Sequence, residues 1–489
     1  MRSTSRSSST TGVDGFASFV GLGSVLLAFL LTVPVACGAA AIGGYEEEPT
    51  FLFSGPVLST LPEPYFPTMF VARDLDGDGK VDLVVPGRDP EDRLLTLRGS
   101  GTGAFAIQQV LPAEGFVDWV EVVDIDGDRI DDLVAAWRGD LPRLVVYRGL
   151  GAGAFDAPRV VADVALGMGR DPQGLAAADF DGDGDVDFAV ASHVGQAVEV
   201  FSNVGSAPGA FAFERVARIG LGRFVGGLAY PRMVAAGDVD GDGDVDLVAN
   251  EIGGARIAVL RNEAGRFARA VEHLAPRIGT ERPGMAGLVL ADADRDGDLD
   301  VVAPALLLEG EQRAIVFVND GTGGLSSTRV IPGPAAGYAF ATAVADFDGD
   351  GDLDLVTGAA LPGGVTFTRC DDATEGVYAR DAFWLFGSLV RHVGAVDVDG
   401  DCDLDLVMVE GPSRTVVVRR NLTPQPGCGG VASTMEVVAA DPGVSQASPI
   451  APGSVDLDRD GDADAADLAA WLLGLHRTSS QTAGPGESP

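Results

Sequence analysis

The chain has 489 residues and a formal net charge of −38, because 72 Asp and Glu residues outnumber 34 Lys and Arg residues. An acidic balance of this size argues against nucleic-acid binding, which requires a basic surface. Most of the acidic residues lie in eight short loops, so the negative charge is concentrated in candidate ligand groups rather than spread over the surface.

The N-terminal segment predicts export from the cytoplasm. Arg2 and Arg6 precede an apolar stretch from Phe19 to Ala36, which ends in the small residues 36–41. This pattern is typical of a secretory signal over residues 1–41. A retained membrane anchor and a lipid-linked Cys37 are the two alternatives, and all three place the rest of the chain outside the cytoplasm.

An acidic pattern, Asp-x-Asp-x-Asp-x-x-x-Asp, occurs seven times along the middle of the chain. The copies begin at intervals of between 50 and 59 residues, at Asp74, Asp124, Asp179, Asp238, Asp292, Asp346 and Asp397. A period of this size predicts a repeat architecture, with one structural unit per copy. We call these segments the acidic loops and number their positions from the first Asp.

The spacing of the carboxylates predicts a calcium site in each acidic loop. Ca²⁺ takes six to eight oxygen ligands, and carboxylates at alternate positions of a tight loop can surround it, with a backbone carbonyl supplied at position 7. The expected ligands are Asp74, Asp76, Asp78, Lys80 and Asp82; Asp124, Asp126, Asp128, Ile130 and Asp132; Asp179, Asp181, Asp183, Asp185 and Asp187; Asp238, Asp240, Asp242, Asp244 and Asp246; Asp292, Asp294, Asp296, Asp298 and Asp300; Asp346, Asp348, Asp350, Asp352 and Asp354; and Asp397, Asp399, Asp401, Asp403 and Asp405.

Position 6 is where the loop must turn sharply, and Gly is the residue that adopts the required conformation at least cost. Arg129 and Cys402 replace Gly there in the second and seventh loops. A side chain in a left-handed conformation is strained, so we expect these two loops to bind calcium more weakly.

Electrostatics favours a bound cation. Two carboxylates about 4 Å apart repel each other by roughly 1 kcal/mol in water and by about 4 kcal/mol at an effective dielectric constant of 20. Position 12 is Val85 in the first loop and is not acidic in any of the seven, and a strand-like apolar run follows each loop. The loops are therefore not EF-hands, and we expect the ion to brace two strands.

Each repeat contains four candidate strands, which is typical of a β-propeller blade. The fold class predicted is all-β: a seven-bladed β-propeller with four-stranded blades over residues 50–422. The seventh repeat lacks a fourth strand, and an unassigned strand-like segment, 51–58, precedes the first repeat. We expect that segment to complete the seventh blade and close the ring, which removes two open sheet edges.

The repeats resemble a known family. The run Val-Ala-Asp-Phe-Asp-Gly-Asp-Gly-Asp-Leu-Asp-Leu-Val at 344–356, with the Gly-x-Gly-x-Phe turns at 101–105 and 151–155, is similar to the FG-GAP/VCBS repeats of the integrin α-subunit head propeller. The resemblance covers about residues 50–422. It implies a calcium-braced ring that serves adhesion or protein binding, and some relatives are lectins or accompany polysaccharide-active enzymes.

Propeller topology puts the connections between the second and third strands, and between blades, on the face opposite the acidic loops. Arginines recur in those connections, and they suggest a face that receives an acidic glycan or an extracellular protein. The alternative is a set of scattered, solvated side chains. The residues concerned are Arg88, Arg138, Arg170, Arg223, Arg256, Arg277, Arg282 and Arg313.

The C-terminal region predicts a linker over 423–454, a calcium loop and helix over 455–477, and a disordered tail over 478–489. The loop fills position 12, as an EF-hand requires, and the apolar residues around Trp471 predict a helix after it. The expected ligands are Asp456, Asp458, Asp460, Asp462, Asp464 and Asp467. The segment resembles one repeat of a dockerin, which has two, so we do not expect it to bind a cohesin.

The remaining motifs predict a binding protein rather than an enzyme. His193, His273, His392 and His476 are far apart, and neither a Gly-x-Ser-x-Gly elbow nor a P-loop occurs. A carboxylate that holds calcium is also unavailable as a general acid. The leading expectation is a secreted or cell-surface propeller for adhesion or for protein or glycan binding. The alternative is a polysaccharide-associated lectin or lyase.

The cysteines leave one question open. If Cys37 is removed with the signal, Cys370, Cys402 and Cys428 remain, and an exported protein is expected to use two of them in a disulfide. The sequence does not decide which two.

Overall fold

The computed structural model describes residues 52–423, except for 89–92, 139–141, 164–171, 194, 206–210, 222–229, 253–254, 280–281, 307–312, 333–338, 360–362 and 386–388. The expected N-terminal signal, the C-terminal calcium loop with its helix, and the disordered tail lie outside these residues, as does the linker beyond Thr423. The described residues form strands, turns and bends but no helix, and therefore include no helix that could span a membrane.

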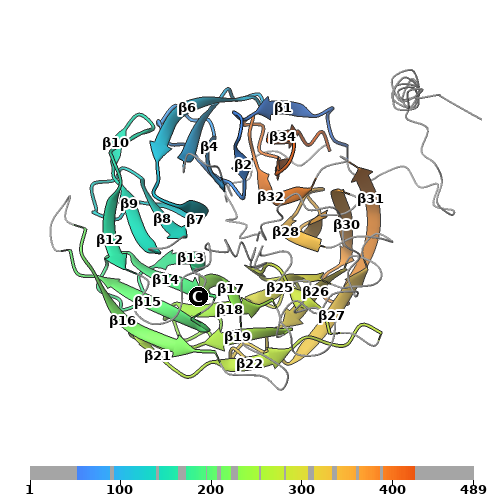
Figure 1. Ribbon diagram of the computed structural model, residues 1–489. Helices are drawn as coiled ribbons and strands as arrows, with labels where there is room; N and C mark the ends of the chain where they lie inside the picture. The colour runs from blue at the N-terminus through green and yellow to red at the C-terminus, as the bar shows by residue number, and fades with distance from the viewer. Residues whose placement is uncertain are drawn as a thin grey trace, which may run out of the picture. The chain divides into compact units, whose positions relative to one another are not determined.

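Seven antiparallel sheets of four strand positions each are arranged around a common centre (Figure 1). The first three blades contain, from the innermost strand outward, β2 (Phe66–Pro67) and β3 (Val71–Arg73) with β4 (Asp82–Arg88), β5 (Arg93–Gly99) and β6 (Phe105–Pro112); β7 (Phe116–Val123), β8 (Asp132–Arg138), β9 (Arg143–Tyr147) and β12 (Arg159–Asp163); and β13 (Pro172–Ala178), β14 (Asp187–Ser192), β15 (Ala197–Asn203) and β16 (Phe213–Gly220).

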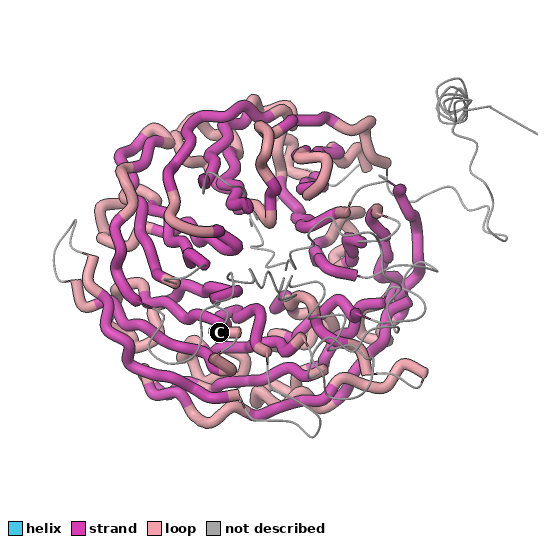
Figure 2. Tube along the Cα trace, in the orientation of Figure 1, coloured by secondary structure: helices cyan, strands magenta, loops and turns pink. Residues whose placement is uncertain are grey.

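The other four blades repeat this order (Figure 2). They contain β17 (Pro231–Gly237), β18 (Asp246–Glu251), β19 (Arg256–Leu260) and β22 (Val271–Leu274); β23 (Gly284–Met285) and β24 (Val289–Ala291) with β25 (Asp300–Leu306), β26 (Arg313–Val318) and β27 (Ser327–Pro332); β28 (Ala339–Ala345), β29 (Asp354–Ala359), β30 (Gly364–Asp372) and β31 (Val377–Leu385); and β32 (Val390–Val396), β33 (Asp405–Glu410), β34 (Thr415–Arg419) and β1 (Val57–Thr60). Two small hairpins, β10 (Gly149–Gly151) with β11 (Ala154–Phe155) and β20 (Asn262–Glu263) with β21 (Arg266–Phe267), complete the set.

The two ends of the described chain close the ring, as the sequence predicts. Strand β1 pairs antiparallel with β34, with Val57 opposite Val418 and Thr60 opposite Thr415. The strand lies at 57–60 rather than over 51–58, and Phe53 instead forms an isolated bridge to Asn421. The seventh blade therefore has no unpaired outer edge along β34, which is the edge that another chain would otherwise join.

The core includes the apolar residues on the strands that leave the acidic loops. Leu83, Val84 and Val85 on β4 are fully buried, and the same holds for Leu133, Val134 and Ala135 on β8. Both faces of these strands are covered because each blade packs between two neighbours, so the runs are continuously apolar rather than alternating. This packing fixes both ends of each acidic loop.

Candidate metal centres and the opposite face

Each acidic loop connects the innermost strand of a blade to the second strand. Hydrogen bonds from the backbone of the loop to its own position-1 carboxylate hold its shape. In the first loop, Gly77 N–H donates to Oδ1 of Asp74 at 2.9 Å, and Gly79 N–H donates to Oδ2 at 2.9 Å. Equivalent pairs of bonds reach the position-1 carboxylates Asp124, Asp179, Asp238, Asp346 and Asp397. The position-1 side chain thus holds the turn in place before any ligand binds.

Position 6 adopts the left-handed conformation that the sequence predicts. Gly79 has φ of 80°, and the two exceptions, Arg129 and Cys402, have φ of 67° and 76°. The strain expected at these two positions is therefore present. Whether it weakens cation binding there stays a prediction.

The cysteine pairing is also partly decided. Cys402 is disulfide-bonded, and Cys370 is a buried free thiol. Of the two described cysteines, Cys370 is therefore the spare thiol.

The position-9 carboxylate is a buried brace in all seven loops. In the fourth loop, Asp246 accepts a bond from Val239 N–H at position 2, at 3.1 Å, and another from Asn262 N–H at the end of the third strand, at 2.7 Å. Burial raises the pKa of Asp246 to about 6, while the two backbone donors act against that rise. The same two bonds recur at Asp82, Asp132, Asp187, Asp300, Asp354 and Asp405.

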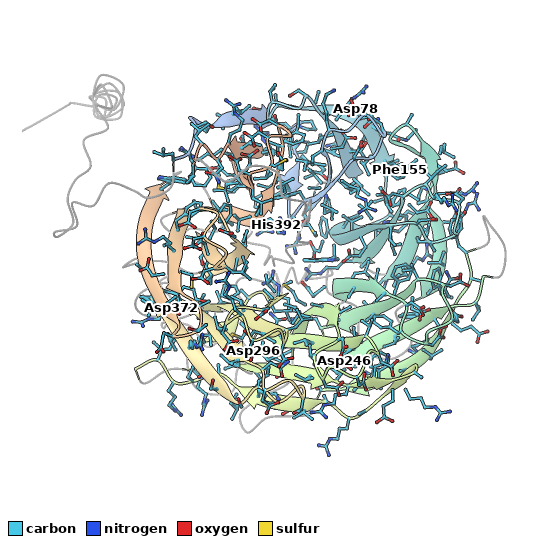
Figure 3. The ribbon with its side chains drawn as sticks, turned by 180° about the vertical axis from the view of Figure 1, so that it is seen from behind. Asp78, Phe155, Asp246, Asp296, Asp372 and His392 are labelled. Carbon is cyan, nitrogen blue, oxygen red and sulfur yellow. The ribbon has the colours of Figure 1, made fainter. Side chains whose placement is uncertain are left out.

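The carboxylate oxygens converge. One oxygen from each of three loop residues lies within 4.8 Å of the other two in Asp74/Asp76/Asp78, Asp124/Asp126/Asp132, Asp179/Asp181/Asp187, Asp238/Asp240/Asp246 and Asp292/Asp294/Asp296, and in two further groups. Asp78 lies near the rim of the ring, whereas His392 lies near its centre (Figure 3). All the donors are carboxylates, which suit hard cations such as Ca²⁺ and Mg²⁺.

The position-3 carboxylates supply a specific test of this fit. In Asp181, Asp240, Asp294 and Asp399, Oδ1 is buried and receives no well-aligned hydrogen bond, while Oδ2 of each has a polar or charged neighbour. In Asp76, Asp126 and Asp348, Oδ1 instead accepts the backbone N–H of position 5. An unpaired buried carboxylate oxygen is costly unless a cation or donor satisfies it. The donor set and these oxygens therefore fit a divalent cation bound inside the loop.

For Lys80 and Ile130 at position 7, the expected ligand is the backbone carbonyl. The Lys80 side chain instead forms an ion pair, with Nζ 2.9 Å from Oδ2 of Asp78. The converging groups contain positions 1 and 3 together with 5 or 9 in the five cases named above. The C-terminal ligands from Asp456 to Asp467 lie outside the described residues.

Sequence reasoning missed a set of asparagines that joins the loops to neighbouring blades. Each lies at the end of a third strand, is buried, and donates from Nδ2 to the position-2 carbonyl of the preceding acidic loop. The pairs are Asn203 with Ile125 at 3.2 Å, and Asn262 with Phe180, Asn319 with Val239 and Asn421 with Phe347, each at 2.7 Å. The signal was available, since an Asn recurs after the third strand of these repeats.

We expect Asn262→Ala to lower the free energy of unfolding by about 1–3 kcal/mol, because it leaves the buried Phe180 carbonyl without this donor. Urea unfolding measures the change. Asn262→Asp keeps the shape and removes the donor, so it should destabilise the protein at least as much. A loss under about 0.5 kcal/mol in both variants would contradict a role for this bond in joining the blades.

The arginines on the face opposite the acidic loops are expected to be available to an acidic ligand, but three of them form ion pairs within the protein. Arg88 Nε lies 2.7 Å from Asp118, and Arg138 lies 3.0 Å from the same carboxylate. Arg256 is buried and pairs with Glu251 at 3.0 Å. These three arginines are thus held in ion pairs inside the protein, while Arg170 and Arg223 lie outside the described residues.

Asp118 makes the stability of this face depend on pH. Burial opposes its ionisation, but the charges and hydrogen bonds of Arg88 and Arg138 outweigh that effect and hold its pKa well below the usual range. A depressed folded-state pKa contributes stability at pH values above the unfolded-state pKa, and this stability is lost as the pH falls.

We therefore expect Asp118→Asn to lower the free energy of unfolding at pH 7 by about 3 kcal/mol, since two largely buried guanidinium groups lose their buried carboxylate. The difference from the wild type should shrink as the pH falls below about 4. Urea titrations between pH 3 and pH 7 provide the measurement. A gap that stays constant over this range would show that the ionised pair is not its source.

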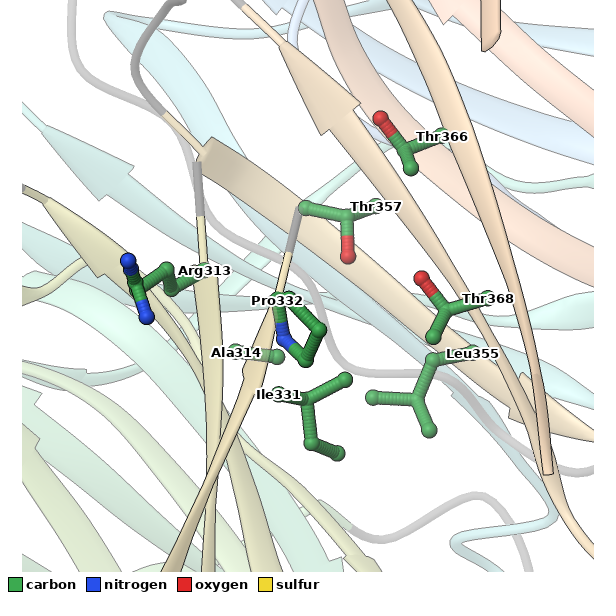
Figure 4. A pocket seen from close by; sticks show the side chains of 8 residues that line it. All are labelled: Arg313, Ala314, Ile331, Pro332, Leu355, Thr357, Thr366 and Thr368. Carbon is green, nitrogen blue, oxygen red and sulfur yellow. The ribbon is translucent and has the colours of Figure 1, made fainter. Parts of the chain in front are cut away.

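Two of the histidines are buried against aromatic rings, and one small cavity lies between two blades. His193 is fully buried against Tyr230, with ring centroids 4.8 Å apart, and His392 packs edge-on against Phe70 at 4.6 Å. A cavity between the fifth and sixth blades is lined by Arg313, Thr357, Thr366 and neighbouring residues (Figure 4). It has space for about one water molecule.

Comparison with known proteins identifies the repeat family and similar folds. The FG-GAP-like repeat family matches residues 74–135, 124–190, 179–249, 238–303 and 305–357. No curated protein matches the chain. Two solved structures of BBS1N in complex with ARL6DN, soaked with mercury and with lead, are similar at TM-scores of 0.51 and 0.50, with 14% identity over 76% of this chain and 97% of theirs. A lectin from Agrocybe aegerita that recognises non-reducing terminal N-acetylglucosamine has a TM-score of 0.46 and 20% identity over 66% of this chain and 80% of its own.

Proposed function

Because this chain belongs to the FG-GAP-like repeat family, we propose that it is a secreted or cell-surface β-propeller that binds Ca²⁺ in its acidic loops and acts in adhesion or in protein or glycan recognition. The observation that carries the calcium proposal is the buried Oδ1 of Asp181, Asp240 and Asp294, which receives no well-aligned hydrogen bond and belongs to residues of the converging carboxylate groups. A divalent cation supplies the missing charge at those oxygens.

The residues of the chain have separate roles in each loop. The carboxylates at positions 1, 3 and 5, such as Asp179, Asp181 and Asp183, would bind the ion. Position 9 would bind it while its two backbone bonds hold the loop to the third strand. Since the position-2 carbonyl accepts a bond from the next blade in four places, a filled loop also stiffens the contact between blades. Calcium thus makes the ring a rigid platform.

A rigid ring exposes loops from every blade on each of its two faces, which suits binding rather than catalysis. The strongly acidic composition and the N-terminal export pattern support a place outside the cytoplasm, where calcium is abundant enough to fill sites with dissociation constants of about 10⁻⁴ to 10⁻³ M. We propose an extracellular protein or an acidic glycan as the partner; an acidic glycan would have to use arginines other than Arg88, Arg138 and Arg256, which are held in ion pairs.

A pull-down with the full chain as bait tests this function. Proteins and glycans from the cell envelope are captured in 1 mM Ca²⁺ and in EGTA, and a glycan array is probed in the same two buffers. We expect a partner that is retained in calcium and released in EGTA. Retention that is equal in both buffers would contradict a calcium-dependent platform, and turnover of a bound acidic glycan would contradict the assignment as a non-enzyme.

A further inference from the structure

Six of the seven acidic loops hold an ion pair between a cationic side chain and one of their carboxylates. The pairs are Arg98 with Asp76 at 2.8 Å, Arg148 with Asp126 at 2.9 Å, Arg261 with Asp240 at 3.6 Å, Arg329 with Asp294 at 3.2 Å, Arg295 with Asp352 at 2.8 Å and Arg420 with Asp399 at 3.0 Å. In five of these six, the carboxylate is the one at position 3.

The third loop is different. Ser202 Oγ donates a hydrogen bond to Oδ2 of Asp181 at 3.0 Å, and no cationic side chain pairs with this loop within the described part of the chain. Ser202 takes the place that Arg98, Arg148 and Arg420 take in other blades, since each directly precedes the residue whose backbone N–H bonds the position-9 carboxylate. The substitution changes the charge of the loop and leaves its hydrogen-bonded frame intact.

The loops therefore differ in charge although their backbones are alike. The first loop has four carboxylates at the odd positions, and two cations, Lys80 and Arg98, pair with them. The third loop has five carboxylates and, among the described residues, no paired cation. A positive side chain about 5 Å from a bound divalent ion repels it by an amount that corresponds to roughly tenfold in affinity when water screens the charges.

We infer that the arginine paired with each of the six loops is a counter-cation that sets the calcium affinity of that loop, and that the third loop, where Ser202 takes its place, is the high-affinity site. The arginine offsets the repulsion among the carboxylates when calcium is absent and opposes calcium when it enters. This inference rests on the proposed calcium binding. It adds that the seven loops fill in order rather than together.

Two opposite substitutions test the inference: one adds an arginine at the third loop, and the other removes the arginine at the seventh loop. Ser202→Arg and Arg420→Gln are prepared in the full chain, with Arg420→Lys as the matched control that keeps the charge. Calcium binding is measured by flow dialysis, and the C-terminal loop contributes equally to every variant. We expect Ser202→Arg to weaken the tightest class of propeller sites by about tenfold. We expect Arg420→Gln to tighten the seventh loop by about tenfold over its wild-type affinity, which the strained Cys402 keeps below that of the third loop. Arg420→Lys should leave the profile unchanged.

A second readout separates counter-charge from general support of the fold. In EGTA, Arg420→Gln should melt at a lower temperature than the wild type, because the loop carboxylates lose their cation. In saturating calcium the difference should vanish or reverse, whereas a purely structural arginine would lower the melting temperature in both buffers.

The outcomes distinguish this inference from the function on which it rests. Calcium binding with the wild-type profile in both Ser202→Arg and Arg420→Gln would overturn the inference and leave calcium binding in place. If Ser202→Arg fails to fold, Arg420→Gln decides alone. Absence of calcium binding in the wild type would overturn the inference and the proposed function together.

Discussion

Removing calcium with EGTA should lower the melting temperature of the full chain by roughly ten degrees or more, and millimolar calcium should restore it. A site that binds only the folded state at ten times its dissociation constant stabilises the protein by about 1.4 kcal/mol, so seven such sites contribute about 10 kcal/mol. At the sensitivity usual for domains of this size, that free energy corresponds to a shift of at least ten degrees.

The comparison needs a control for general salt effects. Millimolar Mg²⁺ added to the EGTA-treated protein should recover less of the stability than calcium does, because Mg²⁺ demands a tighter octahedral arrangement and gives up its water reluctantly. Circular dichroism at 218 nm follows the loss of strand structure during heating. A melting temperature that is the same with EGTA and with calcium would mean that the carboxylate repulsion in the loops is relieved without a divalent ion.

Asp246→Asn should lower the free energy of unfolding by about 2–4 kcal/mol, even in EGTA. Both carboxylate oxygens accept backbone N–H bonds, so an amide must place its NH₂ group against one of these donors and leave that donor buried without a partner. The residue is fully buried, so water cannot replace the lost bond. Urea unfolding in EGTA isolates this effect from the loss of a cation ligand.

Asp156→Asn is the control for that substitution. Asp156 is about half exposed and pairs with Arg159 at 3.5 Å, so its change should cost under about 1 kcal/mol. Equal losses for the two variants would show that the position-9 carboxylate is not the brace of the loop.

The sequence predicts the parts of this molecule that depend on the spacing of residues within each repeat. The period of the acidic loops, the apolar runs after them and the strand-like segment before the first repeat were enough for the seven-bladed ring and for its closure through β1 and β34. The left-handed conformation at Arg129 and Cys402 followed from their place in the loop. Each of these features needs only the spacing of residues within one repeat.

The missed features depend on contacts between segments that the ring brings together. Asn262 donates to Phe180, which is 82 residues away in the preceding blade, and no spacing rule within a repeat points to that carbonyl. The pairing of Arg88 with Asp118 likewise crosses from the first blade to the second. Arginine alone in a loop is compatible with a free surface or an ion pair, and only packing between blades decides which of the two forms.

The most direct test of the account is the calcium content of the folded protein. The full chain is dialysed against 1 mM CaCl₂ and then briefly desalted, its metals are counted by inductively coupled plasma mass spectrometry, and crystals grown in calcium are examined for anomalous scattering at the loops. We expect an anomalous peak between the position-1 and position-3 carboxylates of each blade, strongest and most persistent at Asp179 and Asp181. A well-ordered ring whose loops show no such peaks, with no bound calcium in solution, would contradict the account.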